Sequence, residues 1–185
     1  MLKLNVPTIE TKRLILRPIQ LEDASDLFEY ASDEEVVRYL SWPRHTELAT
    51  SETSIRDRFL TRPDHGIPEA YAIVWKEEMK MIGTVDVHTV HHNDVGEIGY
   101  VLNRHYHNRQ ITTEALQAAL KVWFADTGFR RLEIMHNVTN IASRRVIEKC
   151  GFRKEGEYRQ LTREKDGKYY DFAFYALLKS DLESE

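Results

Sequence analysis

A segment rich in hydrogen-bond donors lies near the middle of the chain, at residues 107–116 (HNRQITTEAL). Arg109 carries a fixed positive charge that can pair with phosphate oxygens, and Thr112 and Thr113 add hydroxyl donors. If a helix begins here, its first backbone N–H groups and the positive end of its dipole point at one place. The segment could therefore hold a phosphorylated ligand, although most helix starts bind nothing. The alternative is that a threonine only caps the helix.

Two carboxylates lie in apolar, strand-like segments and are candidates for acid–base chemistry. Glu97 lies in GEIGY (96–100) and Asp86 lies in TVDV (84–87). A carboxylate flanked by apolar residues loses solvation, which favours the protonated form and suits a proton acceptor. The alternative for either residue is a cross-strand or surface role without chemistry.

Neither a metal site on the histidines nor a nucleophilic cysteine is supported by the residue spacing. No Cys, Asp or Glu completes a recognised ligand spacing with the clustered histidines, so no metal site is expected. Cys150 lies at the C-terminal end of a predicted helix, where the helix dipole disfavours a thiolate, so we interpret it as a small buried residue. The clustered histidines are His88, His91, His92, His105 and His107.

Composition indicates a globular protein in a reducing compartment. The 185 residues are 42% hydrophobic and 30% charged, enough to bury a core. The formal charge of −4 argues against a nucleic-acid partner. No apolar run is long enough to cross a bilayer and no signal-peptide pattern begins the chain, so we expect a cytoplasmic protein with no membrane partner. The single cysteine excludes an internal disulfide.

Strand and helix patterns alternate along the chain and must position these residues. Apolar helical spacing, with cap residues at Asp33 and Asn140 and glycines at Gly128 and Gly151, predicts the helices. Asp166-Gly167 predicts the turn of a final hairpin over 157–178. We predict strands over 13–18, 70–76, 81–90, 96–102 and 131–138, and helices over 23–40 (interrupted near 32–33), 48–60, 113–126 and 140–152. The order gives a mixed sheet with an α/β crossover at its centre.

Four segments, in this order along the chain, carry a family resemblance. They are ETKRLILRPIQLEDASDLFEYASDEEVVRYLSW (10–42), GEIGYVLNRHYHNRQITTEAL (96–116), NIASRRVIEKCGF (140–152) and YYDFAFYALLKSDL (169–182). Together they resemble the GCN5-related N-acetyltransferase (GNAT) superfamily, and within it the ribosomal-protein N-terminal acetyltransferase (RimJ/RimL-type) branch. The resemblance covers about residues 8–179. It implies a GNAT fold of the α+β (α/β) class in a single domain spanning 1–185, with a mostly antiparallel mixed sheet of about seven strands and helices on both faces.

The resemblance also implies acetyl-CoA as co-substrate, with no metal. The backbone N–H groups of one loop would hold the pyrophosphate, and one strand would pair with the pantetheine arm. Asn140 matches the residue whose side chain reaches the pantetheine amides. The implied cofactor-binding residues are Arg109, Gln110, Ile111, Thr112 and Thr113 in the loop, and Tyr100, Val101 and Leu102 in the strand.

The implied reaction is direct attack of an amine on the acetyl thioester. Glu97 matches a glutamate common at that position and is the expected base, and Ser143 matches the proposed acid of this branch. The tyrosine that many superfamily members use as the acid falls on Ile147 here. The branch also places a glutamate in the region of 160–164, where the nearest match is Thr162 and Glu164 stands two residues on.

The pyrophosphate loop departs from the family pattern, because Asn108 and Gln110 replace its two usual glycines. Glycine suits such loops because positive φ costs it nothing, and asparagine tolerates left-handed angles better than most residues. If Gln110 keeps ordinary helical or bridging angles, its N–H can still point at phosphate. Cofactor binding is expected to persist.

The acceptor amine stays open between a protein N-terminus, a polyamine, an amino acid derivative and an aminoglycoside. Tyr39 and the loop from Trp42 to His45 would flank the acceptor side or simply pack on the core. The alternative to an enzyme is an inactive acetyl-CoA-binding or partner-binding module of the same fold. The apolar and aromatic final hairpin leaves a homodimer possible.

Overall fold

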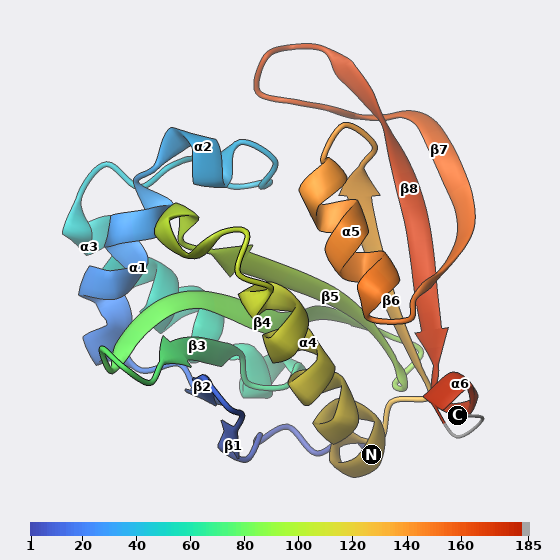
Figure 1. Cartoon of the computed structure of the whole chain (residues 1–185), viewed down its shortest axis with the longest axis horizontal. Helices are drawn as coiled ribbons and strands as arrows, with labels where there is room; N and C mark the ends of the chain where they lie inside the picture. The colour runs from blue at the N-terminus through green and yellow to red at the C-terminus, as the bar shows by residue number, and fades with distance from the viewer. Residues whose placement is uncertain (183–185) are drawn as a thin grey trace.

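A twisted sheet of eight strands runs through the protein, as the computed structural model of residues 1–182 shows (Figure 1). The order across the sheet is β1-β2-β3-β4-β5-β6-β8-β7, and β5 with β6 is the parallel pair. The strands are β1 Ile9–Glu10, β2 Leu14–Pro18, β3 Tyr71–Trp75, β4 Lys80–His91, β5 Val95–Leu102, β6 Arg131–Asn137, β7 Arg153–Arg163 and β8 Tyr169–Leu178.

Helices cover both faces of this sheet (Figure 1). The helix α4 and, beside it, α5 lie over one face, and α1 with α3 covers the other. The helices are α1 Ala24–Ala31, α2 Glu34–Val37, α3 Leu48–Ser54, α4 Ile111–Val122, α5 Ile141–Lys149 and α6 Lys179–Leu182. Short 3₁₀ turns cover Leu21–Asp23, Arg62–His65 and Arg104–Tyr106, and π-helical turns cover Ile55–Phe59 and Trp123–Thr127. Within residues 1–182, no helix is long and apolar enough to span a membrane.

The predicted fold class is confirmed, and the strand count is eight rather than seven. The additional strand is β1, whose two residues are too few to show an alternating pattern. β8 lies between β6 and β7, so β7 is an edge strand, and all but one of its residues are exposed.

Helix boundaries follow the predicted caps, with differences of a few residues. The Asn140 side chain accepts a hydrogen bond from the Ser143 backbone N–H at 3.1 Å, and Gly128 and Gly151 have φ of +101° and +84°. The predicted helix over 48–60 is α-helical only as far as Ser54 and continues as a π-helical turn. The helix predicted from residue 113 begins two residues earlier, because Ile111 is already in the core at 1% exposure.

Alternation along the strands divides the core into two layers. On β3, Tyr71 and Ile73 pack in the layer beneath α4, whereas Ala72 and Val74 pack in the layer against α1. Trp123, at the end of α4, is fully buried in the first layer. Because both faces of the central strands are covered, the sheet forms a rigid support for side chains at its edges and gaps.

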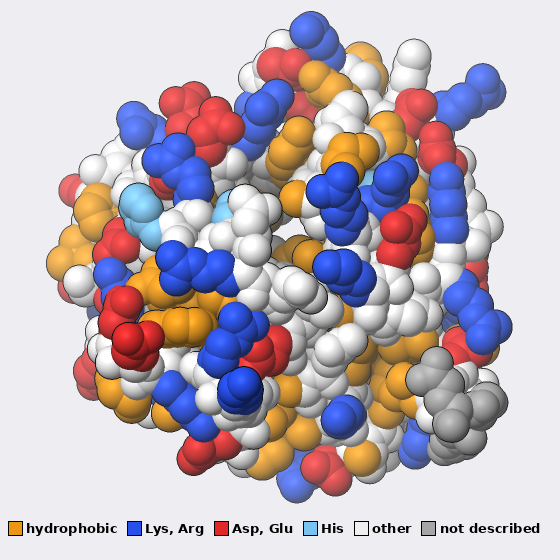
Figure 2. Space-filling view, viewed as in Figure 1, with side chains coloured by type: hydrophobic (Ala, Val, Ile, Leu, Met, Phe, Trp, Pro, Cys, Tyr) orange, Lys and Arg blue, Asp and Glu red, His pale blue; other side chains and the backbone are white. Residues whose placement is uncertain are grey.

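β5 and β6 pair only over their first residues and then separate. Their parallel register joins Val95 to Arg131, Gly96 to Leu132 and Glu97 to Glu133, whereas β5 continues to Leu102. No other strand of residues 1–182 fills the gap that opens beyond Glu97. Figure 2 shows this side of the molecule hollowed between the loop that leads into α4 and helix α5, with Lys and Arg side chains around the hollow.

Candidate active site

The gap between β5 and β6 opens into a cavity of about 510 Å³, here called the central pocket. Residues from α1, α3 and its π-helical extension, the β4 and β5 strands, the end of β6, the N-terminal half of α5, and β8 line it. It therefore touches both layers of the molecule. Five of the residues predicted for the site line this pocket together: Glu97, Tyr100, Val101, Asn140 and Ser143.

The other predicted binding residues lie outside the central pocket. Leu102 is buried, and its carbonyl accepts a hydrogen bond from His107 Nε2 at 3.0 Å. The residues from Arg109 to Thr113 form the loop and first turn of α4. The Arg109 guanidinium stacks over the Tyr106 ring, 5.5 Å from its centroid. Arg109 is exposed at the loop surface. The structure thus separates the predicted residues into a pocket group and a loop group.

The sheet register places the two predicted catalytic residues on opposite faces. Glu97 pairs with Thr89 and shares its face with Gly99 and Val101, the face covered by α1. Tyr100, one residue on from Gly99, points to the other face, where it meets Ser143 of α5. A group placed in the gap could therefore be approached from one face by Glu97 and from the other by Ser143.

The two carboxylates of the central pocket have different surroundings. Asp86 forms an ion pair with Arg62, and the two side chains are only 10% and 11% exposed. Arg62 also donates to the Val87 carbonyl at 3.2 Å and stacks over the Phe59 ring. Glu97 is 20% exposed, and His91 Nε2 lies 3.8 Å from its Oε2. Asp86 is therefore committed to a structural ion pair, whereas Glu97 keeps an oxygen available to the pocket.

The hydroxyl groups of Ser143 and Tyr100 form a close pair. Tyr100 Oη lies 2.7 Å from Ser143 Oγ and 3.1 Å from the Ser143 carbonyl oxygen. Burial raises the pKa of Tyr100 above its ordinary value, although the hydrogen bond to Ser143 opposes this rise. Asn140 caps the helix by accepting from the Ser143 N–H, which fixes the serine backbone beside the pocket.

The loop before α4 keeps the left-handed backbone angles that suit glycine, although Asn108 and Gln110 stand at the two positions where the family usually has glycine. Asn108 has φ of +61° and Gln110 has φ of +57°, so both occupy the left-handed region. Gln110 therefore does not have the ordinary helical or bridging angles that the sequence analysis considered for it. The local geometry is imposed on a residue that disfavours it by about 1–2 kcal/mol. The N–H groups of the first turn of α4 remain free of intrahelical partners, as in any helix start.

A network of hydrogen bonds holds the start of α4 against the first strands. Glu114 accepts from Thr11 Oγ1 at 2.6 Å and from Arg13 Nε at 2.8 Å. Arg13 in turn donates to the Arg109 carbonyl at 3.0 Å. Burial raises the pKa of Glu114, but the hydrogen bonds from Thr11 and Arg13 outweigh it and leave the pKa below its ordinary value. This network was not predicted, since its partners lie about a hundred residues apart in the chain.

Cys150 is buried at 6% exposure, and burial raises the pKa of its thiol to about 12. Its Sγ lies 3.9 Å from the Thr113 carbonyl, between α5 and α4. These surroundings agree with a packing role and disfavour a thiolate.

Within residues 1–182, no group of three or more His, Cys, Asp and Glu side chains is arranged to hold a metal.

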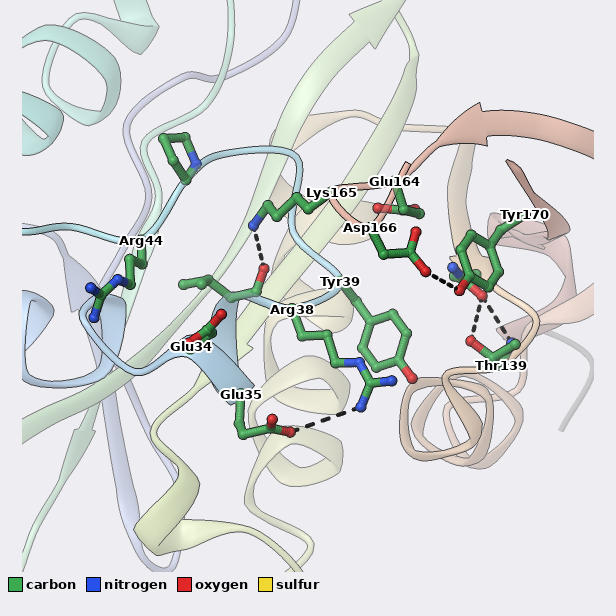
Figure 3. Close-up of a pocket in the computed structure, with 13 residues that line it drawn as sticks. Glu34, Glu35, Arg38, Tyr39, Arg44, Thr139, Glu164, Lys165, Asp166 and Tyr170 are labelled. Atoms are coloured by element: carbon green, nitrogen blue, oxygen red, sulfur yellow. Dashed lines mark hydrogen bonds and ion pairs between the residues drawn. The ribbon is translucent and has the colours of Figure 1, made fainter. Parts of the chain in front are cut away.

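A second cavity, of about 500 Å³, lies between the α2 segment and the β7–β8 turn and is here called the outer pocket (Figure 3). It shares Tyr39 and Asn137 with the central pocket, so the two cavities adjoin. Lys165 reaches from the turn to the α2 side (Figure 3). There Nζ donates to the Val37 carbonyl at 2.7 Å and to the Trp42 carbonyl at 2.8 Å. Glu164 lines this outer pocket rather than the central one.

Tyr39, Trp42 and His45 line the central pocket, so the residues expected to flank the acceptor side are pocket residues. Other lining residues were not found from the sequence. Arg62 gave no signal beyond a helix end before Pro63, since its partner lies on β4. Tyr30 and Phe172 fell within ordinary helical and alternating patterns, and these patterns predict burial but not contact with a pocket.

Proteins of similar sequence carry the name of N-acetyltransferases. Residues 13–153 match the family described as acetyltransferase (GNAT) domain. The uncharacterized N-acetyltransferase p20 of Bacillus licheniformis is 30% identical over 178 residues, which cover 94% of this chain and 97% of that protein. The uncharacterized N-acetyltransferase YnaD of Bacillus subtilis (strain 168) is 28% identical over 173 residues, which cover 94% of this chain and 98% of that protein.

Solved structures share the fold. An acetyltransferase (GNAT family) from Bacillus anthracis has a TM-score of 0.84 at 25% identity, covering 94% of this chain and 99% of that one. RimL, a ribosomal L7/L12 alpha-N-protein acetyltransferase in complex with coenzyme A, has a TM-score of 0.84 at 23% identity, covering 93% and 98%. Because the family model matches residues 13–153 and a relative is 30% identical over 94% of the chain, the chain belongs to the GNAT acetyltransferase family.

Proposed function

We propose that this protein transfers an acetyl group from acetyl-CoA to a primary amine by direct attack of the amine on the thioester. The observation that carries the proposal is the gap where β5 leaves β6, with Glu97 at its start and Ser143 across it. Family membership supports the reaction class. Structures in the same fold hold coenzyme A, in RimL, or acetyl-CoA, in the microcin C7 self-immunity acetyltransferase MccE.

The described residues fit the cofactor's chemistry in two places. β5 beyond Glu97 presents main-chain N–H and C=O groups to a gap that no strand of residues 1–182 occupies, and an amide-bearing arm could pair there as a strand does. The left-handed angles at Asn108 and Gln110 lead into the first turn of α4, whose N–H groups suit pyrophosphate oxygens. We propose these roles for Tyr100, Val101 and Leu102, and for residues 109–113, with Asn140 beside the arm.

Acetyl-CoA supplies an activated thioester, and the protein must supply proton transfer and charge stabilisation. An alkylamine with a pKa near 10.4 is mostly protonated at neutral pH, so a base is needed. We propose that Glu97 accepts the amine proton, directly or through a water. Main-chain N–H groups of β5 polarise the carbonyl. Ser143 donates a hydrogen bond to the departing sulfur.

The acceptor side of the site is the face of the sheet covered by α1. Tyr39, Trp42 and His45 line the central pocket there, and the adjoining outer pocket extends the space toward the β7–β8 turn. An extended acceptor such as a peptide N-terminus would use both pockets, whereas a small amine would use the central pocket alone. RimL is named for a ribosomal-protein substrate, and MccE was solved with AMP as well as acetyl-CoA.

Calorimetric titration with acetyl-CoA and with desulfo-CoA tests the co-substrate assignment. We expect one site per chain for both ligands, because the proposed contacts are to the pyrophosphate and the pantetheine amides rather than to sulfur. Absence of binding for both would contradict the enzyme and the alternative of a non-catalytic binding module alike. Binding without thiol release for any amine would favour the module.

Three further properties stay proposals. We propose that residues 1–185 act as one domain in the cytoplasm. We also propose a homodimer through the final hairpin, because the edge strand β7 exposes Tyr158 and Leu161, and Tyr169 on β8 is 61% exposed. Light scattering during size-exclusion chromatography measures the molar mass, and a monomeric mass at tens of micromolar protein would contradict the dimer.

A further inference from the structure

The hydrogen-bond geometry around Ser143 leaves one rotatable group. The serine backbone is fixed by the cap from Asn140 Oδ1 to the Ser143 N–H at 3.1 Å, so the Oγ–H rotor remains to be oriented. Its close partner is the Tyr100 hydroxyl, at 2.7 Å. Both residues line the central pocket, and each is about half-buried or more.

The single proton of the Tyr100 hydroxyl has two acceptors, the Ser143 carbonyl oxygen at 3.1 Å and Ser143 Oγ at 2.7 Å. If Tyr100 donates to the carbonyl, the Ser143 Oγ–H donates to Tyr100 Oη and is turned away from the gap. If Tyr100 donates to Oγ instead, the serine proton is free to point into the pocket. The pair is therefore a switch between two hydrogen-bond arrangements that needs no movement of the backbone.

We propose that Tyr100 is a positioning residue that holds Ser143 as the hydrogen-bond donor to the leaving sulfur. This role deepens the proposed function and rests on it. In the working arrangement Tyr100 donates to Ser143 Oγ, and the Ser143 O–H points into the gap. A hydroxyl that itself accepts a hydrogen bond is a stronger donor, so Tyr100 strengthens the contact of Ser143 with developing negative charge.

The step balances without a proton from Tyr100. The step starts from the neutral amine, after the ammonium proton has passed to solvent and Glu97 is again a carboxylate. The amine nitrogen forms a bond to the acetyl carbon, the carbon–sulfur bond breaks, and its electron pair stays on sulfur. Glu97 holds the proton that the nitrogen loses, and Ser143 donates a hydrogen bond to the thiolate. Since burial raises the pKa of Tyr100, its hydroxyl keeps its proton, and remains a donor, throughout the pH range in which a folded enzyme would work.

A double-mutant cycle tests this role, with steady-state thiol release from acetyl-CoA and the best amine as the measurement. We expect Tyr100→Phe and Ser143→Ala each to lower kcat about tenfold, the size of effect that one hydrogen bond supplies. The KM for acetyl-CoA should stay within about twofold of the wild type. The double variant should be no slower than Ser143→Ala alone, because Tyr100 acts only through the serine.

Tyr71→Phe is the matched control, since Tyr71 is also a buried tyrosine, its hydroxyl has no partner among the described residues, and it lies outside the pocket lining. It should leave kcat unchanged. An unchanged kcat in Tyr100→Phe would overturn the inference, as would a double variant with multiplied losses of about a hundredfold. A loss that appears in KM rather than kcat would assign Tyr100 to binding and also overturn it. A wild-type protein without turnover on any amine would instead overturn the proposed function itself.

Discussion

At the residue scale, the central pocket assigns different roles to its two carboxylates. Asp86 is held by Arg62 in a nearly buried ion pair, so its charge serves the fold. Within residues 1–182, no side chain forms such a pair with Glu97 at hydrogen-bonding distance, and His91 Nε2 lies 3.8 Å from its Oε2. A base must be free to accept a proton, which makes Glu97 the better candidate of the two.

Glu97→Gln should therefore lower kcat roughly a hundredfold or more, because the amide cannot accept the amine proton. The free energy of unfolding should change by no more than about 0.5 kcal/mol, since the ion-pair contact of Glu97 with His91 is as long as 3.8 Å. Thiol-release kinetics and urea denaturation measure the two quantities. A variant with wild-type kcat would remove Glu97 from the mechanism.

Asp86→Asn serves as the comparison and should show the opposite pattern. It leaves the buried Arg62 guanidinium without its counter-charge, so it should lower the free energy of unfolding by about 3 kcal/mol. Urea denaturation of this variant and of Arg62→Met/Asp86→Leu separates the cost of an unpaired charge from the value of the pair. A fully stable Asp86→Asn would show that the ion pair does not hold the fold.

At the element scale, the loop into α4 keeps a left-handed backbone at residues that are not glycine. Gln110 N-caps α4 with φ of +57° and ψ of +20°, and its side chain makes no capping hydrogen bond. Hydrogen bonds to the first strands hold the strained loop in place. Arg13 donates to the Arg109 carbonyl, and Thr11 and Arg13 both donate to the Glu114 carboxylate. The tertiary network therefore replaces what glycine would supply locally.

Gln110→Gly should raise the free energy of unfolding by about 0.5–1 kcal/mol, because relief of the left-handed strain exceeds the added entropy of the unfolded chain. Affinity for acetyl-CoA should stay the same or increase. Gln117→Gly is the control on the same helix, where a glycine in ordinary helical angles should lower stability by about 1 kcal/mol. Thermal denaturation compares the two, and a destabilised Gln110→Gly would contradict the strain.

Glu114→Gln should lower the free energy of unfolding at pH 7 by about 1–2 kcal/mol, through loss of charge-assisted hydrogen bonds from Thr11 and Arg13. The pKa of Glu114 is lower folded than unfolded, so the carboxylate stabilises the folded state above the ordinary glutamate range near 4.3. This contribution is lost as pH falls through the folded-state pKa. Urea denaturation at pH 7 and at pH 3 should show the difference from wild type shrinking, and a constant difference would contradict the linkage.

At the scale of the whole molecule, the proposed function depends on the gap between β5 and β6, which pair over only three residue positions. Two core layers hold β4, β5 and β6 in place, and the separation of β5 from β6 leaves a gap that joins the two faces. Glu97 approaches the gap from the layer of α1, and the Tyr100–Ser143 pair approaches from the layer of α5. In the proposed mechanism, this arrangement lets the two reactants meet in the gap from opposite sides.

Local patterns predicted much of this architecture. The alternation in residues 96–102 and the helix caps at Asn140 and Gly151 depend on neighbours in the chain, so the sequence could predict them. The ion pair of Arg62 with Asp86 and the contact of Tyr100 with Ser143 were not predicted, because they join residues 24 and 43 positions apart. The left-handed angles of Gln110 contradict its own preference and follow only from tertiary contacts.

The most direct test of the account is thiol release from acetyl-CoA by the wild-type protein across a panel of peptide N-termini, polyamines, amino acid derivatives and aminoglycosides. The account predicts release that depends on one class of primary amine and falls roughly a hundredfold in Glu97→Gln. Mass spectrometry should find the acetyl group on the acceptor nitrogen. Tight acetyl-CoA binding with no amine-dependent release from any member of the panel would contradict it.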